Sequence, residues 1–552
     1  MPTVLDIPAK AYRGLRLMML VNGVQKLVIF LLNSSLLRRT SPDIMGVANV
    51  QLELFLSTLL FFAREGVRLA LLREIVDSPE KRQLFVNLSW LPSIVLFVGA
   101  VGFLAYAYCA DHFSNSLEHH SSQATMFVML LYCIGALFES CGEAWINLYQ
   151  NSLHFTPKLG AETLALCVRS VVVFVSLVHF KIGVLGFGFG QLGYGLTHLL
   201  FVISHSGSIF DETETSLAVR DYCPRLSGEC RWVSGSTLSF AFSATASSLL
   251  KHVLTEADKI TLTLTRTNVE QGVFAIANNY AGLVARLAFA PVEESARAAF
   301  ARFSQTLTQL EADKKKASGR EKDEEKKVVL RDMAQLLARL LKAVAALGLV
   351  VVAFGPSFVR LAVNLFLAPQ WRREETVQTL AAFCLYIGML ALNGVSEAFV
   401  YALAEGFTGI NLTLGVSSAV YVVANYLLYE FYPQVGTAGV VLSGTAAYAV
   451  RVAINFHAIW RYFQSHGLDL APHAKSLQPS LPMLATLGAV GAICAESSSR
   501  YAAQETLESG LVHLAIGVVS FLFVVVVAYL LTPKEELEVM GALVMRKKEK
   551  GD

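Results

Sequence analysis

The sequence is poor in charged residues. Only 16% of its 552 residues are Asp, Glu, Lys or Arg, whereas a soluble domain carries about 25%. At the same time, 54% of the residues are hydrophobic. A deficit of this size excludes a large soluble domain as the main body of the protein. The formal net charge of +2 gives no basis for a nucleic-acid partner.

The sequence also lacks the motifs of common enzymes and metal centres. It contains no GxSxG, HExxH, P-loop or kinase motif. Its eight cysteines are scattered without CxxC spacing, so they support neither a disulfide framework nor a zinc site. We therefore predict a protein that is not an enzyme and holds no metal and no cofactor. Because no ATP-binding motif is present, a substrate gradient or ion coupling would have to drive any transport.

One formal nucleotide-binding motif is present but lies in the wrong context. Gly188, Gly190 and Gly193 form a GxGxxG pattern within GFGFGQLG, residues 186–193. A dinucleotide fingerprint follows a strand and opens a soluble helix, whereas this segment is uncharged and apolar throughout. Small residues at such spacings let helices pack closely in lipid, and we interpret the glycines in this way.

Long apolar runs dominate the rest of the sequence. Residues 85–108 contain no charge and exceed the roughly 20 apolar residues that cross a hydrocarbon core. Such runs must be helical, because lipid leaves backbone polar groups no other partner. We predict an all-α integral membrane protein with about fourteen transmembrane helices. The predicted spans are 12–37, 45–72, 84–108, 124–149, 160–180, 184–205, 236–264, 269–296, 328–354, 376–402, 409–430, 436–459, 480–496 and 510–532.

The distribution of basic residues predicts the orientation. Fourteen spans place both termini on one side, and the segments on that side hold 29 of the 45 Lys and Arg residues, against eight in the opposite loops. Cytosolic loops carry the excess of Lys and Arg, so we predict that both termini are cytosolic. The sequons at Asn87 and Asn411 then lie near the cytosol and Asn33 lies within a span, and we expect none to be glycosylated.

A charged segment interrupts the apolar pattern. Residues 311–327, EADKKKASGREKDEEKK, carry seven basic and six acidic side chains and no large apolar one. This composition is typical of a disordered, solvated linker. We predict a disordered cytosolic linker after the eighth span.

An internal repeat relates the two halves of the chain. A shift of 229 residues aligns VAN at 47–49 with IAN at 276–278, and AREGVRLALLR at 63–73 with VEESARAAFAR at 292–302. The second and eighth spans are thereby equivalent helices of two six-helix lobes in parallel orientation, as in some transporters. The predicted regions are an N-terminal lobe at 1–210, a cytosolic connecting loop at 211–235, a C-terminal lobe at 236–465 that contains the charged linker at 304–327, and two further helices with a basic cytosolic tail at 466–552.

Charged residues inside the predicted spans are the candidates for function, because charges at membrane depth are expensive and face a cavity or a partner. One interpretation is that they form ion pairs that hold the bundle together. The other is a cationic cavity for an anionic head group, since Lys and Arg suit phosphates. The candidate phosphate contacts are Lys26, Lys251, Arg286 and Arg451. On the same helix as Arg286, Pro291 is expected to introduce a kink.

A second set consists of candidate ion pairs at a gate between the lobes. Neighbours three residues apart on a helix can pair, and this spacing recurs in both copies of the repeat. Glu139 and Glu143 also share a helix face, without an identified partner. The gate candidates are Arg64, Glu65, Arg68, Glu256, Asp258, Lys259, Glu293, Glu294 and Arg297.

Three stretches resemble the eukaryotic Rft family of the multidrug/oligosaccharidyl-lipid/polysaccharide (MOP) exporter superfamily. They are residues 31–73, LLKHVLTEADKITLTL at 249–264 and FAPVEESARAAFARF at 289–303. The resemblance covers both halves of the chain and fades in the charged linker and after about residue 465. It implies fourteen helices in two six-helix lobes plus two. The charged positions that match the family are Arg38, Arg39, Arg64, Glu65, Arg68, Glu256, Glu293 and Glu294.

The resemblance implies a function in the endoplasmic reticulum membrane. The expected activity is translocation, by alternating access, of a dolichol-diphosphate-linked oligosaccharide from the cytosolic to the lumenal leaflet for protein N-glycosylation. The expected partners are this lipid and the bilayer, with glycosyltransferases of the same pathway as further partners. One alternative is a non-transporting accessory protein of lipid-linked oligosaccharide assembly. Another is an ion-coupled exporter, which is less favoured because Lys26 stands in the first span, where such exporters carry acidic groups.

Overall fold

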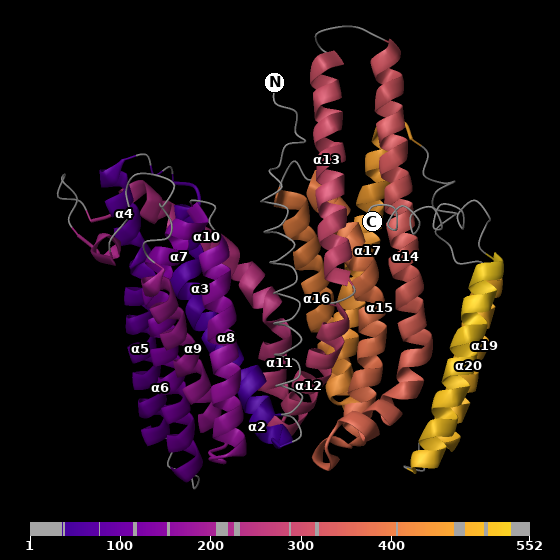
Figure 1. Cartoon of the computed structure of the whole chain (residues 1–552), viewed down its shortest axis with the longest axis horizontal. Helices are drawn as coiled ribbons and strands as arrows, with labels where there is room; N and C mark the ends of the chain where they lie inside the picture. Colours follow the sequence, from indigo (N-terminus) through magenta and orange to yellow (C-terminus); the bar gives the residue numbers. More distant parts are fainter. Residues whose placement is uncertain are drawn as a thin grey trace, which may run out of the picture. The chain divides into compact units, whose positions relative to one another are not determined.

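The computed structural model describes most of the chain as helices (Figure 1). The described residues are 36, 39–74, 76, 78–113, 119–151, 155–205, 219–225, 232–285, 289–314, 320–403, 407–468, 481–501 and 506–531. Within these ranges there is no β-strand. The all-α fold class predicted from the sequence is therefore confirmed.

The helices fall into two compact units, Met1–Ala275 and Ile276–Asp552. The helices up to residue 284 are α2 (Pro42–Gly46), the π-helix η1 (Val47–Gln51), α3 (Leu52–Leu71), α4 (Pro79–Ser89), α5 (Leu91–Phe113), α6 (His119–Cys141), α7 (Glu143–Asn151), α8 (Phe155–Val178), α9 (Leu185–Ser204), the 3-10 helix η2 (Val219–Tyr222), α10 (Gly235–Thr255), α11 (Ala257–Thr265) and α12 (Asn268–Val284). Those that follow are α13 (Ala290–Lys314), α14 (Arg320–Phe366), η4 (Pro369–Trp371), α15 (Glu374–Leu403), α16 (Phe407–Phe431), η5 (Pro433–Val435), α17 (Thr437–Ser465), α19 (Leu481–Arg500) and α20 (Leu507–Leu531).

Ten of the described helices are long and apolar enough to cross a membrane, and a bent pair, 126–141 with 143–151, makes an eleventh. The protein is thus a multi-pass membrane protein. The predicted spans at 236–264 and 269–296 are not among the eleven. The first is divided at Glu256, and residues 286–288 of the second lie outside the described residues. The predicted span 12–37 lies almost wholly outside the described residues, so the count of fourteen stays a prediction.

The boundary between the units falls after α11, because α10 packs along α3 in the first unit. Gly66 of α3 lies directly against the backbone of Ala241 on α10. The hydroxyl of Thr237 donates a hydrogen bond to the carboxylate of Glu74, three residues after the end of α3. The lobes predicted from the repeat, with a connecting loop at 211–235, remain a prediction.

Glycines hold α6 and α9 close together in the first unit. A β-carbon on Gly195 would overlap the carbonyl group of Gly135, and one on Gly135 would overlap the backbone of Gln191. Further along α9, a β-carbon on Gly188 would lie 2.8 Å from Cδ1 of Leu131. The glycine pattern of this segment therefore allows close helix packing, as interpreted from the sequence.

In the second unit, α13 and α14 form a long antiparallel hairpin whose ends project beyond α15 and α17 in Figure 1. The prediction of a disordered linker at 311–327 is wrong for the described part, since α13 continues to Lys314 and α14 begins at Arg320. Lys and Glu favour helix, and Lys326 pairs with Glu311 across the hairpin at 2.6 Å. Leu307 and Leu330 are buried beside this charged end. Residues 315–319 lie outside the described residues.

The last two helices pack against α14 through a buried histidine. The ring of His513 on α20 is fully buried and stacks on Phe358 with ring centres 4.3 Å apart. Its Nε2 lies 3.1 Å from the carbonyl oxygen of Ser357 and its Nδ1 lies 2.8 Å from Oγ of Ser497 on α19. Because a carbonyl oxygen only accepts, Nε2–H is the donor to Ser357, and one ring joins three helices.

The packing of α6 on α9 predicts the effect of a single side chain. Gly195→Val should sharply reduce folded protein, because overpacking a close helix contact costs about 1–3 kcal/mol. Gly102→Val on α5 is the matched control, since nothing lies within 4 Å of its would-be β-carbon. The measurement is the yield of monodisperse protein and its melting temperature in detergent. Equal behaviour of the two variants would contradict the close approach.

Candidate functional site

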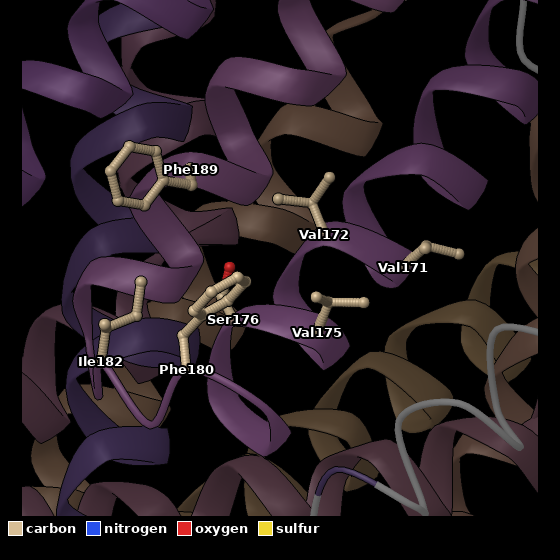
Figure 2. Close-up of a pocket in the computed structure, with 7 residues that line it drawn as sticks. All are labelled: Val171, Val172, Val175, Ser176, Phe180, Ile182 and Phe189. Carbon is tan, nitrogen blue, oxygen red and sulfur yellow. The ribbon is translucent and has the colours of Figure 1, made fainter.

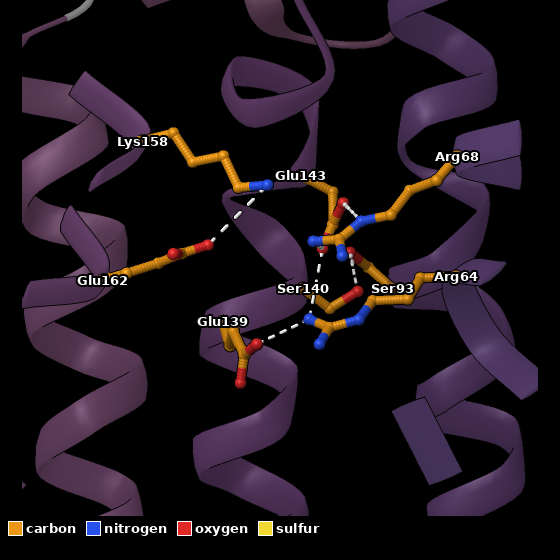
Figure 3. A network of polar contacts seen from close by, with 8 residues as sticks. All are labelled: Arg64, Arg68, Ser93, Glu139, Ser140, Glu143, Lys158 and Glu162. Atoms are coloured by element: carbon orange, nitrogen blue, oxygen red, sulfur yellow. Dashed lines mark hydrogen bonds and ion pairs between the residues drawn. The ribbon is translucent and has the colours of Figure 1, made fainter. Parts of the chain in front are cut away.

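Four charged residues meet inside the first unit, and we refer to Arg64, Arg68, Glu139 and Glu143 as the arginine–glutamate cluster (Figure 3). Arg64 pairs with Glu139 at 2.5 Å and with Glu143 at 3.4 Å. Arg68 donates two hydrogen bonds to Glu143, from Nε at 2.9 Å and from Nη2 at 2.6 Å. The partners of the two glutamates, which the sequence left open, are therefore the two arginines of α3.

Helix geometry explains this arrangement. The two arginines are four residues apart on α3, so they lie on one face of that helix. The two glutamates have the same spacing, but one ends α6 and the other begins α7, and these helices meet at an angle of 42°. The bend lies at Gly142, whose would-be β-carbon would be 3.2 Å from Nδ1 of His198. A larger residue here would press on α9.

The cluster is buried and electrically balanced. The exposed fractions of the side chains are 21% for Arg64, 24% for Arg68, 8% for Glu139 and 1% for Glu143. Two positive and two negative charges compensate each other, which a buried charge requires. The ring of His198 is 4% exposed, and its Nδ1 has no hydrogen-bond partner among the described residues.

The observed ion pairs differ from the pairs of neighbouring residues that were predicted at a gate. Among the described residues, Arg68 pairs with Glu143 rather than with its neighbour Glu65. In the second unit Glu294 is exposed, and the guanidinium of Arg297 lies over the ring of Tyr401, 5.9 Å from its centre. Neither of the two neighbour pairs is formed, and the gate role of these residues stays a prediction.

A second group of polar residues occupies the matching place in the second unit, and we call Glu293, Arg297, Asn393 and Glu397 the α13–α15 cluster. The side chain of Glu293 lies against the backbone of Gly394 on α15. One turn further on, Asn393 donates a hydrogen bond of 2.6 Å to Glu397. Glu397 and Arg297 both act electrostatically on Glu293.

The internal repeat relates the two clusters. Glu293 and Arg297 stand 229 residues after Arg64 and Arg68. In each case two residues four apart in the sequence face them. In the first unit these are two glutamates, one on α6 and one on α7, and in the second an asparagine and a glutamate, both on α15. Glu293 stands at the position of Arg64, and Asn393 is an amide where the first unit has a glutamate.

Arg451 is the one predicted phosphate contact for which the structure describes a bound side chain. Its Nε donates a hydrogen bond of 2.9 Å to Ser417 on α16, and its guanidinium lies 5.2 Å from the centre of the Tyr448 ring. It borders a small cavity of about 20 Å³ together with Glu397 and Asn455. The structure thus brings Arg451 near the α13–α15 cluster.

The other predicted residues are more dispersed. Lys251 is exposed on α10. Glu256 is buried at the junction of α10 and α11 and pairs with Lys259 at 2.9 Å, while Asp258 is half-buried on α11. Lys26, Arg38 and Arg286 lie outside the described residues. Pro291 is the second residue of α13, where proline is tolerated, and residues 286–288 lie outside the described residues, so the expected kink stays a prediction.

The side chain of Asn87, the asparagine of a sequon, is engaged in internal hydrogen bonds. Its side chain is 6% exposed and donates hydrogen bonds to the carbonyl oxygens of Arg225 and Trp232, at 2.6 and 2.9 Å. Its Oδ1 accepts a hydrogen bond from the backbone N–H of Arg225 at 2.9 Å. The residue fastens the loop before α10 and offers no free amide.

One hollow of the first unit is lined by no charged residue (Figure 2). Its volume is about 520 Å³, and it is open. Valines of α8, such as Val171 and Val175, and the rings of Phe180 and Phe189 line it, with Ser176 as the one polar side chain. A hollow without charge does not suit a phosphate, and we expect lipid chains to cover it.

Solved structures share this fold. The inward closed form of the lipid II flippase MurJ is similar over 93% of this chain and 98% of its own, with a TM-score of 0.58 and 12% sequence identity. An inward-facing multidrug resistance MATE family transporter of the MOP superfamily is similar over 80% of this chain and 95% of its own, with a TM-score of 0.56 and 13% identity. The protein therefore has the fold of the MOP superfamily transporters.

Sequence comparison then gives the family. The family described as Rft protein matches residues 10–540, and the chain belongs to it. The Man(5)GlcNAc(2)-PP-dolichol translocation protein RFT1 of Xenopus tropicalis is 27% identical over 461 residues, 80% of each chain. The protein of the same name from Mus musculus is 27% identical over 519 residues, 91% of each chain. The resemblance stated from sequence stretches is thereby confirmed.

The arginine–glutamate cluster predicts a double-mutant result. Glu143→Gln should destabilise the protein by about 3 kcal/mol, because it strands Arg68 in a buried site. Adding Arg68→Gln should restore part of this loss, since the stranded charge is removed. Glu162→Gln is the control, because Glu162 is 40% exposed and lies 3.9 Å from Lys158. Melting temperatures measure the effect, and simple additivity of the two substitutions would contradict the pairing.

Proposed function

We propose that this protein translocates a dolichol-diphosphate-linked oligosaccharide from the cytosolic to the lumenal leaflet of the endoplasmic reticulum membrane, for protein N-glycosylation. The observation that carries the proposal is membership of the Rft family together with relatives named for this translocation, which align with 80–91% of the chain. The fold supports it, because a lipid II flippase shares it over nearly the whole chain.

The charged groups inside the two units suit the transfer of a polar head group across a membrane. An oligosaccharide and a diphosphate cannot cross hydrocarbon without a polar path, since unpaired polar groups and charges are costly there. The protein carries charged groups inside helical units whose outer helices are apolar, so the head group has a path while the polyprenyl chain stays in lipid. Two lobes that alternate in access would move the head group, and substrate gradient or ion coupling would drive them.

The diphosphate contacts proposed from the sequence are Lys26, Lys251, Arg286 and Arg451. Arg451 is supported by its place beside a cavity, where Ser417 and Tyr448 hold its guanidinium. Gate roles for Arg64 and Arg68 are proposed on a changed basis, since their partners are Glu139 and Glu143. An ion pair between α3 and the bent helix can open and close as a unit when these helices move.

The direct test is reconstitution into liposomes with labelled dolichol-linked oligosaccharide. Purified protein should speed the transfer of this lipid between leaflets, measured by its accessibility to a reagent added outside. Protein-free vesicles and vesicles with an unrelated helical membrane protein are the controls. Binding of the lipid without faster transfer would favour an accessory protein that presents the lipid to glycosyltransferases.

Substitution of the phosphate contacts predicts a loss of function without loss of folding. Arg286→Gln and Arg451→Gln should each be expressed near the normal level, because glutamine keeps most of the polar character. Each should weaken lipid-linked oligosaccharide binding about tenfold, which corresponds to roughly 1.4 kcal/mol for one charge-assisted contact. Normal binding by both variants would contradict the cationic cavity.

The proposed orientation places the α13–α14 hairpin in the cytosol. In a background without the native cysteines, a cysteine introduced at Gln309, which is exposed on α13, should react in sealed microsomes with a maleimide that cannot cross membranes. A cysteine at Val422 on α16, 60% exposed, is the control for reactivity within a span. Labelling at Gln309 only after detergent is added would reverse the orientation.

A further inference from the structure

A cavity of about 200 Å³ lies in the first unit where three helices end or begin. α3 ends at Leu71, α4 begins at Pro79 and α10 begins at Gly235, and residues close to each of these ends line the cavity. Two membrane spans, Pro42–Leu71 and Pro79–Tyr106, end and begin at the same place. The cavity therefore lies at the level of the lipid head groups, and its volume is many times the roughly 10–15 Å³ that one water molecule requires.

One wall of the cavity is apolar. Leu71 of α3 and Phe85 and Leu88 of α4 line it, and all three are buried in the apolar core of this unit. Val76 and Leu84 complete the apolar part of the lining. An apolar wall favours an amphiphile over a free ion, because the burial of apolar surface then contributes to binding.

Two opposite charges line the same cavity without pairing with each other. Glu74 is half-buried, and its carboxylate accepts a hydrogen bond from Thr237 of α10. Among the described residues Glu74 forms no ion pair, and the guanidinium of the adjacent Arg73 lies over the ring of Phe240, 4.5 Å from its centre. Lys81 contributes a positive group from the first turn of α4, where the helix dipole also favours an anion. The cavity thus presents a negative and a positive group to one occupant.

These charges restrict the chemistry of the occupant. A simple anion would be repelled by Glu74 and a simple cation by Lys81, whereas a zwitterion satisfies both groups. A carboxylate suits a primary ammonium group, whose N–H bonds donate to it. A quaternary ammonium group has no N–H and is bound by aromatic cages, while Phe85 is the one aromatic side chain among the described residues that line this cavity. A serine head group would bring a further carboxylate, which Glu74 would repel.

We propose that this cavity binds the head group of one phosphatidylethanolamine molecule. The ammonium group contacts Glu74, the phosphate contacts Lys81 and the hydroxyl of Ser234, and the glycerol region lies against the apolar wall. The site goes beyond the proposed function, because the proposed cargo carries a diphosphate and no ammonium group. By contacting the end of α3 and the beginnings of α4 and α10 at once, the bound lipid stabilises the packing of these three segments.

Binding is tested on purified, delipidated protein in detergent. Phosphatidylethanolamine, phosphatidylcholine and phosphatidylserine with identical acyl chains are added one at a time, and the melting temperature is measured. With phosphatidylethanolamine it should be about 2 °C or more above the value with either other lipid, because a ligand of the folded state stabilises that state. Equal melting temperatures with all three lipids would show that the head group is not recognised, and would overturn the proposal.

Two substitutions test the two charges separately. Glu74→Gln removes the charge but keeps the size of the side chain and an acceptor for Thr237, and should weaken the apparent affinity for phosphatidylethanolamine about tenfold. Lys81→Gln changes an exposed side chain and should weaken the affinity to a similar extent, which keeps the test decisive if Glu74→Gln does not fold. Glu80→Gln is the matched control, because Glu80 is the exposed neighbour of Lys81 and is not part of the lining. The proposal is overturned if the variants of Glu74 and Lys81 that fold keep the full lipid preference, or if the control loses it.

Failure of this proposal and failure of the proposed function can be told apart. The lipid preference is measured without any dolichol-linked oligosaccharide. Preference for phosphatidylethanolamine in a protein that transfers no dolichol-linked oligosaccharide would support this site and overturn the proposed function. Transfer by a protein without that preference would support the proposed function and overturn this site.

Discussion

The fold depends on how charge is compensated between helices in a medium that does not solvate it. Within the first unit this is done by direct contact, since two arginines of α3 reach two glutamates on either side of a helix bend. A single unpaired member would be far more costly there than in water. The packing of α3, α6, α7 and α9 must therefore satisfy the cluster as well as the apolar core, and the glycines on α6 and α9 permit the close approach that this needs.

In the second unit charge is compensated differently, although the repeat places polar residues at corresponding positions. Its arginine at the repeated position, Arg297, rests on an aromatic ring rather than on a carboxylate. The carboxylates face each other and a buried amide. The repeat thus keeps polar residues at corresponding positions and changes the sign of their charge.

Much of this could be predicted from the sequence, and the reasons are specific. Apolar runs long enough to cross a bilayer must form helices, so the all-α membrane fold class could be predicted. The shift of 229 residues identified Arg68 and Arg297 as equivalent positions. The four-residue spacing of Glu139 and Glu143 showed that they share a face, but not that α3 supplies their partners, because contacts between helices depend on packing. Asn393 and Glu397 carried the same spacing as a signal and were missed, since a lone amide and acid in an apolar helix resemble satisfied core residues.

The prediction of a disordered linker at 311–327 was wrong for another reason. Composition alone cannot separate a solvated coil from a solvated helix, because Lys, Glu and Ala are common in both. What decides is the apolar contact at Leu307 and Leu330 beneath the charges, together with the pair between Glu311 and Lys326. These contacts join residues more than a dozen positions apart, so no local pattern displays them.

The bend at Gly142 couples the shape of the helix pair α6 and α7 to the arginine–glutamate cluster. Because it separates Glu139 from Glu143, the two carboxylates belong to different helical segments while both bind arginines of α3. Changing the angle of 42° would move one carboxylate relative to the other, so the two ion pairs and the bend depend on each other. Separating either pair would cost more in a medium of low dielectric constant than in water.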